Sequence, residues 1–562
     1  MSERTRRRLY SLYVVLAFIG AIIAAQLVRL QVLEQANWEE DRKANVTRTT
    51  TVKAPRGRIW DRSGNLLADN ITRYQVTADS QNVNIKIAVE QLAPLLNVPP
   101  GELRAKLATL GEPALLATRL PLALGEAVGK LELWAVYSTP YWQRTYPERQ
   151  LLSHVIGFVN AQGTGYYGVE GHYDSLLRGN QRVMEEKRDA YAEPLPFDMA
   201  RLDEPRPGAD LVLTVDRTFQ ALTEAELARA LSETGARSGT IIVMDPRTGA
   251  ILAMASLPAY DPNNFIETPT EHFINPAVSA PYEPGSTFKI VTMAAALEEK
   301  RVKPESVYND TACIEIGGLP ICNWDRKAHG TTSMIDLLAL SLNVGSARLA
   351  TQMGGQTFYR YVQAFGIGRP TGVDLQGEAP GKLRTPGDLD WHESDLGTHS
   401  FGQGLSVTPI QLISAVSAVA NDGIQMRPFV VAQKIEGKQV LTAKPTQLGR
   451  VISAQTARTL TSMLEQAMER EASTAKVPGY RIAGKTSTAQ IPIPGGYDDL
   501  WTIASFVGWG PVSDPKLIIL VKLDRPTTSP YGGQTAAPVF SRLAARMFIL
   551  MGVPPDRVQA SR

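Results

Sequence analysis

The chain has 562 residues, of which 44% are hydrophobic and 20% are charged, and this is the composition of a globular protein with room for several packed cores. Its formal net charge of +2 produces no large field of either sign. The charge balance therefore argues against a nucleic-acid-binding protein and against an acidic partner.

The N-terminus combines a basic cluster with a long apolar run. Residues Leu9 to Val28 are apolar except for Ser11 and Gln26, and four arginines precede them, Arg4, Arg6, Arg7 and Arg8. A run of this length spans a bilayer as a helix, and it lacks the small-x-small cleavage site of a secretory signal. Because basic residues stay in the cytoplasm, we expect a cytoplasmic tail (residues 1–8), a single membrane anchor (residues 9–30) and an exported remainder.

Further along, residues 88–110 carry apolar side chains at helical spacing around a Pro-Pro-Gly turn. This pattern predicts two short helices with a structural role.

A serine and a lysine lie three residues apart in "YEPGSTFKIVTMAAALEE". Pro284 and Gly285 end a loop there, and good helix formers follow from Ser286 onward. Helical spacing places Ser286 and Lys289 on one face, about 5–6 Å apart between Cβ atoms. A lysine kept neutral by burial and a nearby cation can take the proton of a serine hydroxyl, so this pair is a candidate nucleophile and base.

The chain has two cysteines, Cys313 and Cys322, which bracket "IEIGGLPI". In an exported domain this spacing favours a disulfide-bridged hairpin. The alternative is a metal site formed by Cys322 and His329 with Cys313, Asp310 or Asp325.

The stretch "GYRIAGKT", residues 479–486, matches the pattern of a phosphate-binding loop. Residues 480–483 are typical of a strand, however, and Pro492 and Pro494 stand where the helix after such a loop would run. Since the predicted location also holds little nucleotide, we interpret Lys485 as serving another chemistry.

Three short motifs occur in one order along the chain: Ser286-x-x-Lys289, Ser341-x-Asn343 and Lys485-Thr486-Ser487-Thr488. Their order resembles that of the penicilloyl-serine transferases. The chain is similar to the class B penicillin-binding proteins, and the resemblance extends from the anchor nearly to the C-terminus. It includes "APRGRIWDRSGNLLA", "RTYPERQLLSHVIGFVN", "GYYGVEGHYDSLLRG", "GADLVLTVDRTFQ", "HSFGQGLSVTPIQL" and "SFVGWGPVSDPKLIILVKLDRP".

The resemblance implies an architecture. It predicts an elongated pedestal of dimerisation type over residues 31–205, a transpeptidase domain over residues 206–550 and a C-terminal tail over residues 551–562. The domain's expected α/β (α+β) fold is that of serine β-lactamases, a central antiparallel sheet with helices on both sides and the nucleophile at the N-terminus of a buried helix.

The resemblance also implies roles for the site residues. Ser286 would be the nucleophile, Lys289 the general base, and Ser341 with Lys485 would move the proton and supply positive charge. The substrate-binding residues would be Asn343, Thr486, Ser487 and Thr488, with the backbone amides of Ser286 and Thr488 as the oxyanion hole. One letter departs from the family pattern, because Ser487 stands where glycine is usual, and we expect its side chain to narrow the cleft beside the substrate or to alter the affinity for β-lactams.

The implied function is that of a peptidoglycan D,D-transpeptidase that cross-links stem peptides of lipid II-derived strands through an acyl-enzyme. It would be inhibited by β-lactams and would need no metal or cofactor. The implied partners are a glycosyltransferase of the SEDS family and other membrane proteins of the divisome, with residues 9–30 in the cytoplasmic membrane. "HSFGQGLSVTPIQL" favours septal over side-wall synthesis. The alternatives are an elongation-type transpeptidase, a β-lactamase, a bifunctional class A enzyme and a non-catalytic divisome scaffold.

Overall fold

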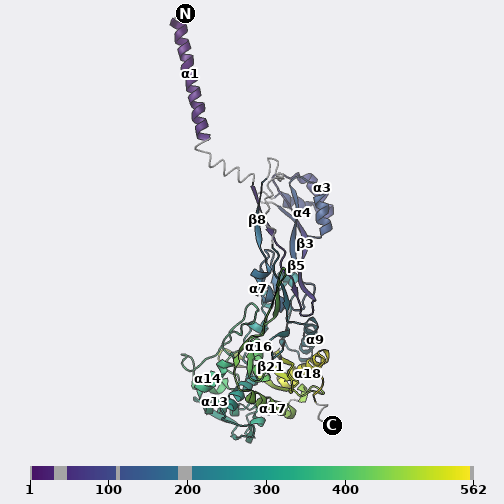
Figure 1. The fold of residues 1–562 in the computed structure, drawn as a ribbon, viewed down its shortest axis with the longest axis vertical. Coiled ribbons are helices and arrows are strands. Elements are labelled where there is room, and N and C mark those ends of the chain that lie inside the picture. Colours follow the sequence, from purple (N-terminus) through teal and green to yellow (C-terminus); the bar gives the residue numbers. More distant parts are fainter. Residues whose placement is uncertain (1–2, 31–46, 109–113, 188–205, 472, 557–562) are drawn as a thin grey trace. The chain divides into compact units, whose positions relative to one another are not determined.

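The computed structural model describes residues 3–30, 47–108, 114–187, 206–471 and 473–556 (Figure 1). The chain forms two compact units. The first comprises Met1–Pro55 and Gly179–Pro207, and the second comprises Arg56–Arg178 and Gly208–Arg562. The predicted boundaries near residues 205 and 550 stay predictions.

In the first unit, helix α1 (Glu3–Val28) covers most of the predicted anchor. Within the described residues its segment Arg8–Val28 is the one helix long and apolar enough to cross a membrane. Strands β1 (Thr47–Lys53) and β8 (Gln181–Lys187) pair in antiparallel fashion. Residues 31–46 and 188–205 of the predicted pedestal lie outside the described residues.

The two short helices predicted over residues 88–110 are present as α3 (Ile85–Leu96) and α4 (Pro100–Leu107), whereas residues 109–113 lie outside the described part. The Asn84 side chain caps α3, and Asn97 ends it in the left-handed conformation. Apolar side chains of both helices form one core with β3 and its neighbours. The structural role expected for these helices is therefore confirmed.

A buried ion-pair cluster joins three of the segments that carry the family resemblance. Arg56 and Arg144 bind the two carboxylate oxygens of Glu170 at 2.6 and 2.7 Å, and Arg56 also binds Asp174 at 2.8 Å. Burial raises the pKa of Glu170, but Arg144 and Arg56 more than offset it and hold that pKa below its usual value. The surrounding elements are β6 (Phe158–Val159), β7 (Gly165–Tyr166), α6 (Ser153–Ile156), α7 (Gly168–His172) and α8 (Asp174–Leu177).

One sheet of the second unit has the strand order β18-β17-β9-β2-β3-β4, with β5 paired to β3. It links N-terminal strands to strands from the second half of the chain, since β2 pairs with β9 in parallel and β9 pairs with β17. Its strands are β2 (Ile59–Trp60), β3 (Leu66–Ala78), β4 (Ala114–Leu120), β5 (Val136–Thr145), β9 (Asp210–Leu213), β17 (Val431–Glu436) and β18 (Gln439–Thr442).

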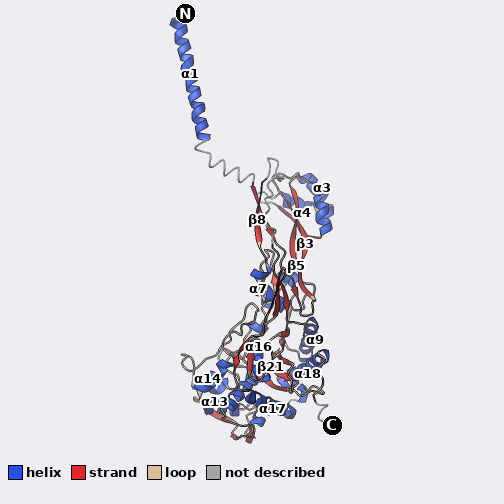
Figure 2. Ribbon diagram, in the orientation of Figure 1, coloured by secondary structure: helices blue, strands red, loops and turns tan. Residues whose placement is uncertain are grey.

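The other large sheet is antiparallel throughout, with the order β11-β10-β22-β21-β20, and Figure 2 distinguishes its strands from the helices around it. Alternate residues of β10 enter two different cores. Ile241 and Val243 pack with α9 (Arg217–Thr234) and α18 (Gly532–Leu550), whereas Ile242 and Met244 pack with α11 (Lys289–Glu298) and α16 (Pro409–Ala420). The predicted sheet with helices on both sides is confirmed. Its strands are β10 (Ser238–Met244), β11 (Ile251–Leu257), β20 (Ala483–Ile493), β21 (Gly496–Gly510) and β22 (Leu517–Asp524).

The second unit contains further helices and short strands, of which α5 packs against β3 and β5. The helices are α5 (Leu122–Gly129), α9 (Arg217–Thr234), α10 (Pro276–Ser279), α11 (Lys289–Glu298), α12 (Met334–Ala339), α13 (Asn343–Met353), α14 (Gly355–Ala364), α15 (Glu393–His399), α16 (Pro409–Ala420), α17 (Ala454–Glu471) and α18 (Gly532–Leu550). The short strands are β12 (Val307–Asp310), β13 (Cys313–Ile316), β14 (Leu319–Cys322), β15 (Gly330–Ser333), β16 (Ile424–Met426) and β19 (Gln447–Arg450). The 3-10 helices are η2 (Pro262–Glu267), η3 (Thr270–His272), η4 (Gly285–Phe288) and η5 (Ser473–Ala475).

Candidate active site

Ser286 lies in the short helix η4, which leads directly into α11 at Lys289. Gly285 makes the turn into this segment with a φ of 56°, a conformation that favours glycine. The helical spacing brings Lys289 Nζ to 3.0 Å from Ser286 Oγ. The structure therefore places the predicted nucleophile and base within hydrogen-bonding distance of each other.

Lys289 is buried among acceptors. Its Nζ donates to the Ser341 carbonyl at 2.5 Å and to Asn343 Oδ1 at 2.8 Å. Its side chain is only 1% exposed. Burial and the neighbouring Lys485 hold the pKa of Lys289 well below its usual value, so the neutral amine is favoured. A neutral amine has two hydrogens, and the two carbonyl oxygens take both, which leaves its lone pair for the hydroxyl of Ser286.

Ser341 lies between the two lysines. Its Oγ is 3.0 Å from Lys485 Nζ and 3.3 Å from Lys289 Nζ, and its backbone is left-handed with a φ of 58°. Lys485 is 4% exposed, and burial lowers its pKa to about 7. The hydroxyl of Ser341 thus connects two buried amines whose pKa values are both lowered.

The cysteine hairpin orients Asn343. Cys313 and Cys322 are paired across β13 and β14 and form a disulfide, so the predicted bridge is present and both sulfurs are unavailable to the alternative metal site. The Cys322 carbonyl accepts a hydrogen bond from Asn343 Nδ2 at 3.1 Å. This contact fixes which end of the amide faces Lys289. Because an amide oxygen accepts two bonds and the amide nitrogen donates two, each atom keeps one position for a ligand.

Strand β20 carries the third motif and forms an edge of its sheet. It packs against η4 and runs from Ala483 to Ile493. The strand predicted over residues 480–483 is therefore wrong for all but Ala483. Tyr480 bonds instead to Val553, and Arg481 bonds to Glu465 of α17 and to Asp556. In a phosphate-binding loop a helix would begin at the lysine. Here Lys485 lies within β20, which continues to Ile493, so the motif is not a phosphate-binding loop. Thr486 and Thr488 alternate with the buried Lys485 along the strand, and Thr488 is exposed.

Ser487 corrects one expectation. Its side chain is 2% exposed, and its hydroxyl donates to the Pro284 carbonyl at 2.8 Å. The side chain therefore lies against the loop before the nucleophile, and the predicted narrowing of the cleft is wrong. A Cβ on Gly285 would come within 2.5 Å of Ser487 Oγ, so the orientation that Ser487 adopts here requires glycine at 285.

The structure adds aromatic residues that the motifs did not indicate. The ring of Phe401, within the landmark "HSFGQG", has its centroid 6.0 Å from Lys289 Nζ. Trp324 donates to the carbonyl of Leu340, next to Ser341, and its ring lies 6.1 Å from that of Tyr531 at the start of α18. Both Trp324 and Tyr531 are exposed beside the site. In the sequence, only the position of Trp324, two residues after Cys322, could have indicated an aromatic side chain beside the site.

Comparisons with known proteins give matches along nearly the whole chain. The family described as penicillin binding protein transpeptidase domain matches residues 239–545, and penicillin-binding protein dimerisation domain matches residues 51–213. Stage V sporulation protein D of Bacillus subtilis (strain 168) is 32% identical over 572 residues, covering 99% of this chain and 88% of that protein. Peptidoglycan D,D-transpeptidase FtsI of Escherichia coli (strain K12) is 30% identical over 547 residues, covering 95% and 90%.

The chain is also similar to a solved structure of a penicillin-binding protein over most of its length. The crystal structure of penicillin binding protein 3 from Mycobacterium tuberculosis, complexed with aztreonam, aligns with a TM-score of 0.71 and 27% identity, covering 90% of this chain and 98% of that chain.

Proposed function

The chain belongs to the class B penicillin-binding proteins, serine-type peptidoglycan D,D-transpeptidases that bind β-lactams, and on this premise we propose that Ser286 is its nucleophile. The observation that carries the proposal is the environment of Lys289. A buried amine 3.0 Å from a serine hydroxyl, with both of its hydrogens taken by carbonyl oxygens, is arranged to accept a proton.

In the proposed first half-reaction, Ser286 Oγ attacks the carbonyl carbon between the two terminal D-alanines of a stem peptide, and its proton passes to Lys289 Nζ. Backbone amides of Ser286 and Thr488 stabilise the oxyanion, a contribution worth about 2.7–4 kcal/mol per donor in other serine enzymes. The C–N bond then breaks, and Ser341 gives its hydroxyl proton to the leaving nitrogen and takes up the proton held by Lys289 Nζ. D-alanine departs, an ester remains, and Lys289 is neutral again.

In the second half-reaction, an amine of a neighbouring stem peptide attacks the ester carbonyl. Its proton returns through Lys289, and the bond to Ser286 breaks. Atoms balance because one D-alanine leaves for each cross-link formed.

We propose that the donor peptide lies along the free edge of β20. Edge strands present unpaired backbone groups that can add an extended peptide. Thr486 and Thr488 would supply hydroxyls to the terminal carboxylate, with Lys485 as a nearby positive charge. The remaining hydrogen of Asn343 Nδ2 would bind the donor's backbone. For Ser487 the proposed part is its backbone alone, since its side chain faces Pro284.

The cellular setting is also a proposal. Helix α1 would anchor the chain in the cytoplasmic membrane with the catalytic domain outside, because four arginines precede the apolar run. The landmark "HSFGQGLSVTPIQL" supports septal synthesis with a SEDS-family glycosyltransferase and other divisome proteins. An elongation role is the second candidate.

Labelling with a fluorescent penicillin tests the proposed nucleophile. The wild-type protein should form a covalent band that is lost in Ser286→Ala and retained in Ser232→Ala, which changes an exposed serine of α9. Absence of label in a folded wild type, with no turnover of a thioester donor, would indicate a non-catalytic scaffold. Rapid release of hydrolysed penicillin would indicate a β-lactamase.

A further inference from the structure

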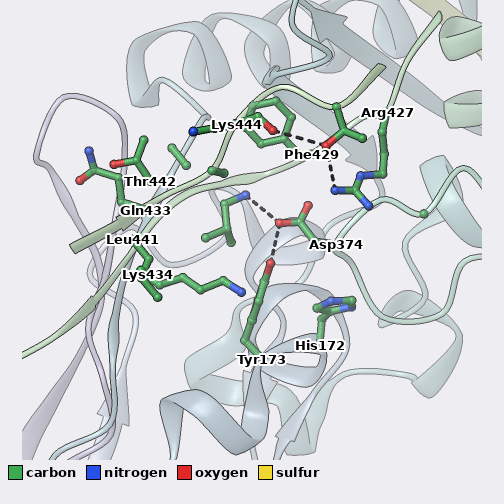
Figure 3. Close-up of a pocket in the computed structure, with 15 residues that line it drawn as sticks. His172, Tyr173, Asp374, Arg427, Phe429, Gln433, Lys434, Leu441, Thr442 and Lys444 are labelled. Carbon is green, nitrogen blue, oxygen red and sulfur yellow. Dashed lines mark hydrogen bonds between the residues drawn. The ribbon is translucent and has the colours of Figure 1, made fainter. Parts of the chain in front are cut away.

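A pocket of about 410 Å³ lies away from the catalytic residues, between the end of α7 and the hairpin formed by β17 and β18 (Figure 3). Its volume falls within the ~300–1,000 Å³ that is usual for small-ligand sites. None of the motif residues lines it. The walls come from His172 and Tyr173, from the loop containing Asp374, and from residues 427–446.

The lining is rich in cations that have no carboxylate partner. Arg427, Lys434 and Lys444 all line the pocket, and within the described residues none of them forms an ion pair. The Arg427 guanidinium donates only to the Thr446 hydroxyl, at 3.1 Å. With one carboxylate, that of Asp374, the lining has an excess of two positive charges when His172 is neutral.

Asp374 forms no ion pair with these cations among the described residues, because its oxygens accept hydrogen bonds from neutral donors. Oδ1 accepts from the backbone of Val430 at 2.6 Å, and Oδ2 accepts from Val431 at 2.9 Å and from the Tyr173 hydroxyl at 2.9 Å. Burial and the charge of Asp374 raise the pKa of Tyr173, so the phenol stays a donor to that carboxylate. Asp374 therefore connects the start of β17 to Tyr173 at the end of α7, and these hydrogen bonds hold one wall of the pocket in place.

Apolar surface completes the lining. Phe429, Val431 and Leu441 lie beside the charged groups, and the Lys434 ammonium is 4.8 Å from the centre of the Tyr173 ring (Figure 3). A cation held over an aromatic face retains most of its charge for a ligand. The pocket thus presents an excess of donors and positive charge next to an apolar wall.

We infer that this pocket is a second binding site, which takes a small dianion of the carboxylate or phosphate class. Two acidic groups match the excess of two positive charges, and lysine and arginine bind both carboxylates and phosphates. Cationic ligands are repelled, and a neutral apolar ligand would cover the half-buried Lys434 without giving it a counter-charge. The inference depends on the charges of the lining and not on the reaction at Ser286.

Calorimetric titration of the full-length protein in non-ionic detergent tests the inference, with the Ser286→Ala variant used throughout so that covalent chemistry cannot contribute. Two probes separate the possible sources of the dianion: N-acetyl-L-alanyl-D-glutamate, which has two carboxylates and no ammonium group, and inorganic pyrophosphate. N-acetyl-L-alanyl-D-glutamine, with one carboxylate fewer, is the matched control ligand. Lys434→Ala and Lys444→Ala alter the pocket, whereas Lys438→Ala removes an exposed lysine of the same hairpin that does not line it.

At least one dianion should bind, and each pocket variant should weaken it about tenfold, as expected for the loss of a charged hydrogen bond. Lys438→Ala should change the dissociation constant less than twofold, and Lys434→Glu should abolish binding. Binding of the dipeptide alone assigns the carboxylate class, and binding of pyrophosphate alone assigns the phosphate class. The inference is overturned if neither probe binds at millimolar concentration, or if Lys438→Ala weakens binding as much as Lys434→Ala. Thermal melting of each variant verifies that it is folded.

Discussion

Replacing Ser487 by alanine tests whether its hydroxyl serves the nucleophile loop or the cleft. In the structure this hydroxyl donates to the Pro284 carbonyl, two residues before Ser286. The Thr287 hydroxyl donates to the same carbonyl at 2.8 Å. Strand β20 and the nucleophile turn are therefore tied together at one oxygen, within a few residues of both proposed oxyanion donors.

The stability that Ser487→Ala should lose can be estimated from the shared Pro284 carbonyl. Deleting a buried hydrogen-bond donor costs about 1–3 kcal/mol, and the low end applies here because Thr287 still satisfies the carbonyl. We expect Ser487→Ala to lower the melting temperature by about 2 °C, given the size of the domain. If the same free energy, about 1 kcal/mol, is also lost from stabilisation of the transition state because the oxyanion donors are less well aligned, the acylation rate decreases about fivefold.

Stopped-flow acylation by a chromogenic β-lactam separates the non-covalent dissociation constant from the acylation rate. The dissociation constant should change less than twofold, because the Ser487 side chain does not face the ligand. Ser487→Gly should behave like Ser487→Ala, with up to about 1 kcal/mol of further destabilisation from the freer backbone. Ser256→Ala is the matched control: it removes a buried hydroxyl that is 3.1 Å from Thr240 in the same sheet, far from the site, and should leave acylation unchanged.

The opposite pattern would refute this reasoning. If Ser487→Ala and Ser487→Gly bind the β-lactam at least tenfold more tightly and acylate at the wild-type rate, the side chain obstructs the cleft.

Three further predictions follow from the site and the fold. The acylation rate should decrease as the pH falls, because Lys289 becomes protonated. Lys485→Met removes a cation that lowers the pKa of Lys289, so it should move the midpoint of the rate–pH profile to higher pH. An unchanged midpoint contradicts this coupling between the two lysines. Replacing Cys313 and Cys322 by serine removes the disulfide and should lower the free energy of unfolding, measured by urea denaturation, by about 2–3 kcal/mol. Penicillin labelling should also slow, because the Cys322 carbonyl that binds Asn343 is no longer held in place. Glu170→Gln should cost about 3–5 kcal/mol in thermal melting while the folded fraction still acylates at the wild-type rate, because two buried arginines lose their carboxylate.

The sequence predicted those parts of the fold that depend on local spacing. An apolar run with basic flanks specified α1, and apolar residues around a Pro-Pro-Gly turn specified α3 and α4. The antiparallel sheet was predicted from the family resemblance, because strand pairing joins residues far apart in the chain. The parallel pairing of β2 with β9 was not foreseen, since nothing local in two-residue β2 indicates its neighbour.

The site shows the same division. Ser286 and Lys289 could be paired from helical spacing alone, whereas their contacts with Ser341 and Asn343 depend on segments more than fifty residues away. The direction of Ser487 could not be read from the motif. Strand alternation would place it on the side of Lys485, but whether that side meets ligand or protein is decided by the approach of Gly285.

The distances around Lys289 fit a protonated amine as well as a neutral one, because an ammonium has three hydrogens for the Ser341 carbonyl, Asn343 Oδ1 and Ser286 Oγ. Geometry alone therefore does not make Lys289 a base. The deciding factors are that no carboxylate is paired with it among the described residues, that it is buried, and that a second lysine lies across Ser341. An ammonium here would be desolvated with neutral acceptors only, so the proton leaves and the same contacts then direct the lone pair at Ser286.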